Sequence, residues 1–144
     1  DGVGLAAPQV GLSLRIFVAD ATMNADEEPA LKDFKKVFVN PEILERYGNS
    51  CTMNEGCLSL PDIHEDVIRP ESVRIRYRDE NMEEHVNEFS GFAARIIQHE
   101  YDHLDGILLI DHLIPLKKRM LKSKLTAISK GKVKTAYQIR IPGK

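Results

Sequence analysis

The residues best suited to chemistry lie in the run from Gln98 to His103, which reads QHEYDH. In a helix, residues four apart lie on the same face, so His99 and His103 can offer two imidazole nitrogens to one metal ion. Glu100 can reach a water molecule bound to that ion. This HExxH pattern is typical of metal hydrolases in which the glutamate is the general base. A catalytic site also needs a third protein ligand, which must come from elsewhere in the chain.

The segment from Ser90 to Leu104 predicts the helix that this motif requires, since it is rich in Ala, Ile and Leu and contains no proline. Ser90 is a candidate N-cap, and Gly106 follows the last turn as a stop. Apolar residues cover much of the circumference, so we expect the helix to be buried. The alternative is that both histidines are merely hydrogen-bonded in the core. Their apolar neighbours cannot supply such partners, which favours the metal interpretation.

Cys57 is the candidate for the third ligand, because it follows a glycine in the run Glu55-Gly56-Cys57 and its thiolate form binds metals. A closed structural site made by Cys51, Cys57 and the two histidines is the alternative. Structural sites usually separate their cysteines by two to four residues, and here five intervene. A closed site would also leave Glu100 without a function. We therefore treat Cys51 as an ordinary thiol.

The chain opens with residues 1–11, DGVGLAAPQVG, whose small residues predict a tight turn that something can approach closely. The stretch lacks the third glycine and the preceding strand of a dinucleotide-binding loop. No lysine follows it, which excludes a phosphate-binding P-loop. By itself it reads as a turn that enters the strand Leu12-Ala19.

Three segments together resemble the peptide deformylase family. Residues 2–9 (GVGLAAPQ) are similar to its first motif, residues 55–59 (EGCLS) to its second, and residues 98–103 (QHEYDH) to its third. They occur in the family's order over about two-thirds of the chain, so coincidence is a poor explanation. The family removes the formyl group from the N-terminal formylmethionine of new bacterial and organellar polypeptides.

The resemblance implies roles for the residues at matching positions. Cys57, His99 and His103 are then the metal ligands, and Glu100 is the general acid and base. The implied cofactor is one divalent ion, Fe(II) in the cell, with Zn, Ni or Co as substitutes in purified protein.

The same resemblance assigns a second set of residues to the substrate. The Gln9 side chain and the Leu58 backbone N–H would stabilise the developing oxyanion. Gly4 would meet the substrate backbone, and Val3 would line the pocket for the methionine side chain. A cramped site of this kind predicts that N-acetyl peptides are poor substrates.

The chain departs from the family pattern at three points. It lacks the N-terminal segment that usually precedes the first motif, so we expect it to be a fragment of a longer polypeptide. His64 stands where many bacterial relatives have an arginine that contacts substrate. Arg95, one turn before His99, either edges the pocket mouth or pairs with a surface carboxylate, and we favour the second.

Composition is typical of one compact catalytic domain over residues 1–144. Two cysteines argue against a disulfide scaffold, and no apolar run is long enough to span a bilayer. We expect a bacterial cytoplasmic enzyme, with an organelle as the alternative. Its expected partners are N-formylmethionyl nascent peptides, and neither a membrane nor DNA.

The expected fold is α+β, with sheets packed around the buried HExxH helix and a C-terminal helix that begins near Pro115. Residues 24–36 read as a polar surface connection, and residues 78–81 as a turn. The expected strands are Leu12-Ala19, Val37-Asn40, Asp66-Ile68, Ser72-Arg78 and Glu84-Phe89.

Charge is divided unevenly along the chain. Residues 1–114 hold all 22 acidic residues, whereas residues 115–144 hold 10 of the 20 basic residues and no acid. One interpretation is an amphipathic helix with a docking face formed by Leu116, Met120, Leu121, Leu125 and Ile128, followed by a solvated end. The other is a basic arm for an acidic partner, and ribosomal RNA is the natural candidate.

Two other functions compete with deformylation. A zinc peptidase of the general HExxH type usually takes its third ligand from a downstream His or Glu, and His112 is the only later histidine. A non-catalytic metal-binding module would use the closed site with two cysteines and two histidines.

Overall fold

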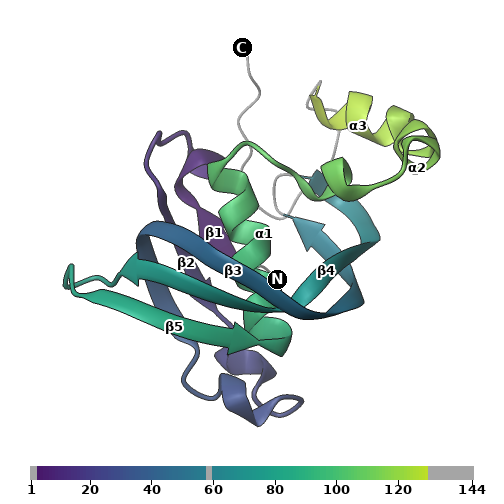
Figure 1. Cartoon of the computed structure of the whole chain (residues 1–144). Coiled ribbons are helices and arrows are strands. Elements are labelled where there is room, and N and C mark those ends of the chain that lie inside the picture. The colour runs from purple at the N-terminus through teal and green to yellow at the C-terminus, as the bar shows by residue number, and fades with distance from the viewer. Residues whose placement is uncertain (1–2, 58–59, 130–144) are drawn as a thin grey trace. The chain divides into compact units, whose positions relative to one another are not determined.

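The computed structural model describes residues 3–57 and 60–129 (Figure 1). The chain divides into two compact units. The first comprises Asp1–Cys51 and Ile68–Leu108, and the second comprises Thr52–Val67 and Leu109–Lys144. A buried helix lies beside the antiparallel sheet in the first unit, so the predicted α+β fold is confirmed (Figure 1).

A five-stranded sheet has the order β1-β2-β3-β4-β5, so neighbours in sequence are also neighbours in the sheet. Pairing is antiparallel between β1 and β2, between β2 and β3, and between β4 and β5. This simple meander brings distant parts of the sequence to the sides of one helix. The strands are β1 Gly4–Ala6, β2 Ile16–Asp20, β3 Lys35–Cys57, β4 Leu60–Arg78 and β5 Glu84–Ser90.

Two strands are much longer than the sequence predicts. β3 extends far beyond the expected Val37-Asn40, and β4 joins the two runs predicted at 66–68 and 72–78. Pro70 lies between these two runs, and a proline within a strand-like run weakens the strand signal. Buried and exposed residues alternate along much of β4, whereas β3 buries few of its residues, so no long apolar run marks either strand.

The helix α1, Gly91–Leu104, carries the HExxH motif and is buried, as predicted. It contacts β1, β2 and β5, and its Ala94 and Ile97 are wholly inaccessible to solvent. Phe17 and Phe38 stack on each other in the same core, with ring centroids 4.5 Å apart. The core therefore holds α1 against the sheet from several strands.

The ends of α1 agree only in part with expectation. Ser90 occupies the N-cap position, but its side chain makes no capping bond, and the Ser90 and Ser72 hydroxyls pair at 2.8 Å instead. Gly106 follows the C-terminal end with φ +74°, a left-handed conformation that glycine adopts without strain.

Two connections differ from the predictions. The opening is not only a turn, because residues 4–6 form β1 and pair with β2 before a 3-10 helix at Ala7–Val10. Residues 24–36 are not wholly a surface connection, since Leu31 and Phe34 are buried in the core. Single apolar side chains in a polar loop can dock in this way without any periodic signal. The turn predicted at 78–81 is confirmed by the bond from Met82 N to Asp79 O.

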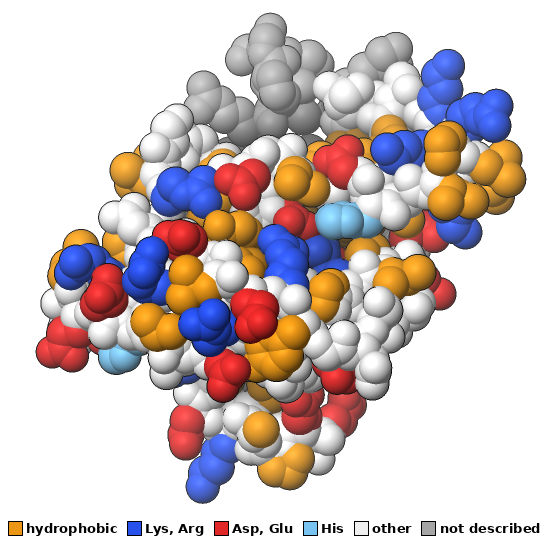
Figure 2. All heavy atoms as spheres, in the orientation of Figure 1, with side chains coloured by type: hydrophobic (Ala, Val, Ile, Leu, Met, Phe, Trp, Pro, Cys, Tyr) orange, Lys and Arg blue, Asp and Glu red, His pale blue; other side chains and the backbone are white. Residues whose placement is uncertain are grey.

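The second unit ends, within the described residues, in α2 Pro115–Met120 and α3 Lys122–Ser129. The single predicted helix is therefore two, and they meet at Leu121. The predicted docking face is wrong for Leu116 and Met120, which are exposed, while the other three members are partly buried. Lysine, arginine and hydrophobic side chains gather over this part of the molecule (Figure 2). The basic arm from residue 130 lies outside the described residues.

Polar contacts attach these helices to the second unit. Lys117 Nζ lies 3.3 Å from Glu65 Oε2, and Lys124 Nζ donates to the Asp62 carbonyl at 3.0 Å. In the part of the chain that the structure describes, none of the helices has the length and apolar character needed to cross a bilayer.

Candidate active site

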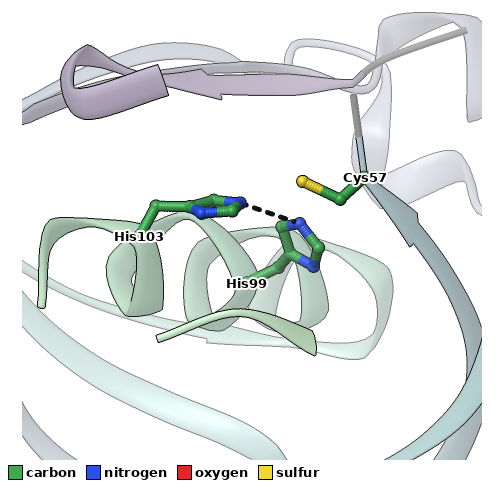
Figure 3. A group of neighbouring side chains, drawn as sticks. All are labelled: Cys57, His99 and His103. Atoms are coloured by element: carbon green, nitrogen blue, oxygen red, sulfur yellow. Dashed lines mark hydrogen bonds between the residues drawn. The ribbon is translucent and has the colours of Figure 1, made fainter. Parts of the chain in front are cut away.

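The site is built around two histidines of α1 and one cysteine of β3. His99 and His103 lie one turn apart, and their Nε2 atoms are 3.3 Å from each other. Cys57 is the last residue of β3. One ligand atom from each of the three residues lies within 4.8 Å of the others, and the cysteine sulfur points toward the imidazoles (Figure 3).

The donor set suits a divalent metal ion. For metal–nitrogen bonds of about 2.0–2.1 Å in a tetrahedron, two nitrogens should stand roughly 3.3 Å apart. The observed separation of the two Nε2 atoms is 3.3 Å. One thiolate and two imidazoles also leave a fourth position for water or substrate, as in catalytic sites. The residues therefore fit a metal ion without rearrangement of the histidine pair.

Glu100 lies beside this group. Its side chain is buried, and its Oε1 is 3.9 Å from His99 Nε2. Gly4 of β1 packs directly against it, because a Cβ built on Gly4 would stand 2.8 Å from Glu100 Cγ. The glycine of the first motif therefore makes room for the glutamate of the third, which the sequence alone did not indicate.

Gln9 has a fixed orientation. Its Oε1 accepts a hydrogen bond of 2.7 Å from the backbone N–H of Ala6, across the 3-10 helix. The carbonyl end of the amide is thus held by the chain itself, and the nitrogen is the donor end. A donor fixed before substrate arrives is what stabilisation of an oxyanion requires.

The other two residues predicted to contact the substrate are Val3 and Leu58. Val3 is half-buried and packs against the core beside β1. Leu58, whose backbone N–H we expect at the oxyanion, lies outside the described residues. His64 lies against Gly56, the neighbour of Cys57, since a Cβ on that glycine would collide with the imidazole.

The structure also locates Cys51, the alternative ligand, and Arg95, the arginine one turn before His99. Cys51 is not a member of the group formed by Cys57, His99 and His103. The carbonyl of Cys51 instead accepts a 2.6 Å hydrogen bond from Arg95 Nη2. Arg95 is buried, so its expected place at the surface is wrong. In the sequence, a single arginine among apolar helix residues does not reveal that its partner is a backbone carbonyl of a strand.

Sequence reasoning missed a row of buried polar residues on α1. Arg95, Gln98 and Asp102 are spaced three and four apart, which places them on one face of the helix. All three are buried. Asp102 forms a 2.8 Å ion pair with the equally buried Arg69 of β4. The signal that could have revealed the row was this helical spacing of polar residues in a segment predicted to be buried.

A second group of possible ligands lies at the β4–β5 turn, where Asp79, Glu83 and His85 approach one another. Asp79 accepts bonds from the backbone N–H groups of Asn81 and Glu83, and its other oxygen pairs with His85 Nε2 at 2.7 Å. These bonds stabilise the turn, which explains the cluster without an ion.

The fold is of the α+β class, and its buried helix carries two of the three residues of a possible metal site. A family model described as polypeptide deformylase matches residues 1–119. The peptide deformylase of Christiangramia forsetii is 52% identical over an alignment of 148 residues, covering 98% of this chain and 76% of that protein. The peptide deformylase of Cytophaga hutchinsonii is also 52% identical, over 141 residues, with 98% and 76% covered. The chain belongs to the peptide deformylase family, a family of enzymes.

Solved structures agree with this assignment. A Plasmodium falciparum peptide deformylase superposes with a TM-score of 0.79 at 37% identity, covering 95% of this chain and 77% of that one. The Thermotoga maritima peptide deformylase gives 0.69 at 42% identity, with 80% and 71% covered. The similarity therefore extends over the sheet and the helix that carry the site.

Proposed function

We propose that this chain is a metal-dependent hydrolase that removes the N-formyl group from the N-terminal formylmethionine of newly made polypeptides. The observation that carries the proposal is the convergence of Cys57, His99 and His103 beside the buried Glu100. We also propose that residues 1–144 act as one catalytic domain. The family model supports this, since its match over residues 1–119 includes segments of both compact units.

The ligands are Cys57, His99 and His103 in this proposal. These residues would hold a divalent ion, which would supply the Lewis acidity for water ionisation near neutral pH. Glu100 takes the proton of the attacking water and later passes it to the departing amine. Its position against Gly4 and 3.9 Å from His99 Nε2 keeps the carboxylate beside the proposed ligands.

The remaining residues act on the substrate. The Gln9 amide nitrogen and the Leu58 backbone N–H donate to the oxygen on which negative charge develops. Gly4 offers a backbone without a side chain to the extended peptide, and Val3 contacts the methionine side chain. The bond from Ala6 N–H to Gln9 supports this assignment, because it fixes the amide before the reaction begins.

The proposed ion is Fe(II), with Zn, Ni or Co as replacements in purified protein. Imidazole and thiolate ligands bind all of these ions, and the order of affinities does not itself select iron. Elemental analysis of protein purified without oxygen identifies the ion directly.

Measurement of formate release from a formyl-Met peptide by metal-loaded protein tests the activity. We expect rapid release from this peptide and little acetate from the matched N-acetyl peptide, since the formyl carbon carries only a hydrogen. Failure to release formate, in protein with one ion per chain, would refute the proposal. Equal rates on both peptides would refute the steric account of specificity.

The structure gives less support to the two competing functions. A general HExxH peptidase would take a later histidine as its third ligand, but Cys57, not His112, is grouped with His99 and His103. A closed structural site would include Cys51, which is likewise absent from the group. The position of Cys57 thus favours an open site.

We further propose a bacterial cytoplasmic location, with an organelle as the alternative. The similar proteins from the bacteria Christiangramia and Cytophaga support the first. The proposed partners are formylated nascent peptides and, through the basic arm from Lys130 onward, the ribosome. The run of 10 basic residues without an acid after residue 114 supports an anionic partner such as RNA.

A further inference from the structure

The HExxH helix is fixed to the sheet by polar bonds on the face next to its histidines. Gln98 and Asp102 directly precede His99 and His103, so the two pairs form adjacent rows along α1. Gln98 is 0% exposed and Asp102 is 4% exposed. Such burial is costly for polar groups unless strong partners compensate.

Those partners come from consecutive residues of one strand. Asp102 Oδ2 accepts a 2.8 Å bond from Arg69 Nη1, and Gln98 Nε2 donates a 2.9 Å bond to the carbonyl of Pro70. The other end of the Gln98 amide accepts a 3.3 Å bond from Arg46 of β3. The helix is therefore tied to β4 one residue before each histidine, and to β3 one residue before His99.

We propose that Arg69 is a positioning residue for the metal site, acting through Asp102, with Gln98 as the second point of attachment. This inference rests on the proposed metal-dependent function. Neither Arg69 nor Gln98 needs to touch the ion. Together they set the rotation of α1 about its axis and thereby the direction of both imidazoles.

Helix geometry shows why rotation matters. An imidazole nitrogen stands about 6 Å from the helix axis, so a rotation of about 10° moves it by roughly 1 Å. Metal–ligand distances tolerate only about 0.2 Å. Apolar packing alone allows such small rotations, because it is not directional. Hydrogen bonds are directional, and two of them one turn apart oppose the rotation.

Stability alone gives a weak reason to keep this ion pair. A buried pair pays a large desolvation cost, and well-packed apolar residues of similar volume often give equal or greater stability. Both Arg69 and Asp102 are almost fully buried, at 2% and 4% exposed. A role in orienting α1 explains the presence of this buried ion pair, whereas a contribution to stability does not.

The test compares metal affinity with fold stability. The double variant Arg69→Met/Asp102→Leu fills the space with apolar atoms, and Asp102→Asn keeps the shape but removes the charge. Arg69→Lys keeps the charge and tests for partial rescue. The control is Ile75→Val or Ile75→Ala on the same strand, chosen so that its Tm as apoprotein matches that of Asp102→Asn.

Each apoprotein is titrated with Co(II) against a competing chelator well below its Tm, while the thiolate-to-cobalt and d–d absorption bands are recorded. We expect a Co(II) affinity about 10- to 100-fold weaker, with altered d–d bands, in the double variant and in Asp102→Asn. Arg69→Lys should lie between them and the unmodified protein, and the Ile75 control should keep the unmodified affinity and spectrum.

Unmodified affinity and bands in Asp102→Asn would overturn the inference, even if the double variant does not fold. A loss in the Ile75 control equal to that in Asp102→Asn would also overturn it, because stability would then explain the effect. If the unmodified protein itself shows no thiolate-to-cobalt band, the proposed metal site fails, and this result is distinct from failure of the positioning role.

Discussion

Gly4 and Glu100 occupy adjoining space: a Cβ added to Gly4 would stand 2.8 Å from Glu100 Cγ and 3.2 Å from Glu100 Oε1. The first motif and the third, almost a hundred residues apart, therefore meet at a point where only glycine fits. Glu100 is also the residue that we propose as the general base. The space at Gly4 is thus part of what positions the carboxylate.

Substitution of Gly4 should separate activity from metal binding. In Gly4→Ala the new methyl group pushes the Glu100 carboxylate away, so we expect turnover to fall by about tenfold or more, while the ion stays bound. Formate release and metal content measure the two effects. Gly106→Ala is the control, since its left-handed φ of +74° makes alanine strained while nothing lies within 4 Å of the added Cβ. It should lower Tm but spare turnover, and unchanged turnover in Gly4→Ala would contradict the proposed role of the space.

Removal of the carboxylate tests Glu100 directly. Glu100→Ala eliminates the proposed base but no ligand, so metal should remain while turnover falls by roughly 10²-fold or more. Stopped assays of formate release, normalised to metal content, measure this loss. Near-normal turnover in fully loaded Glu100→Ala would show that another group moves the proton.

The two cysteines should behave differently. Cys57→Ala should lose the metal and the activity, because it removes a proposed ligand. Cys51→Ala should retain both, since Cys51 is not grouped with the histidines and it is its backbone carbonyl that Arg95 binds. Metal content and formate release of both variants decide this. Equal metal loss from the two would establish a closed structural site.

The Asp79 carboxyl group should make the free energy of unfolding depend on pH in the acid range. Its bond with the His85 side chain, then those with the backbone of Glu83 and Asn81, lower the pKa of its carboxyl below the ordinary value. A lowered folded-state pKa gives stability that is present above the unfolded-state pKa of about 3.9 and is lost as the pH falls through the folded value. Asp79→Asn should therefore be less stable than the unmodified protein at pH 6, and the difference should shrink in strong acid. Denaturant unfolding across this range measures it, and a difference that does not change with pH would refute the assignment.

Deletion of residues 130–144 tests the basic arm. Every proposed site residue lies before residue 104, so hydrolysis of short formyl peptides should be nearly unchanged. If the arm contacts RNA, ribosome binding should weaken on deletion, and binding by the intact chain should fall steeply as salt is added. Co-sedimentation with ribosomes measures both. Equal binding by the two forms would show that the arm is only a solvated tail.

Much of the site could be predicted from sequence because its signals are local. The spacing of His99 and His103 has meaning in any helix, since residues four apart share a face. The apolar run around them predicted a buried helix, which the structure confirms. The resemblance to the peptide deformylases rests on three short motifs that occur in the family's order, and the comparisons confirm that family.

Relationships between distant segments were decided only by the tertiary structure. The full lengths of β3 and β4 escaped prediction because polar residues interrupt the apolar runs of both strands and Pro70 stands within β4. Arg95 was placed at the surface because its partner, the Cys51 carbonyl, is 44 residues away in the chain. The fit of Gly4 against Glu100 and the ion pair of Arg69 with Asp102 are likewise invisible in sequence, because each depends on packing that brings two remote backbones together. The residue types determined which chemistry is possible in this protein. The packing of α1 on the sheet determined the orientation of the side chains that would perform it.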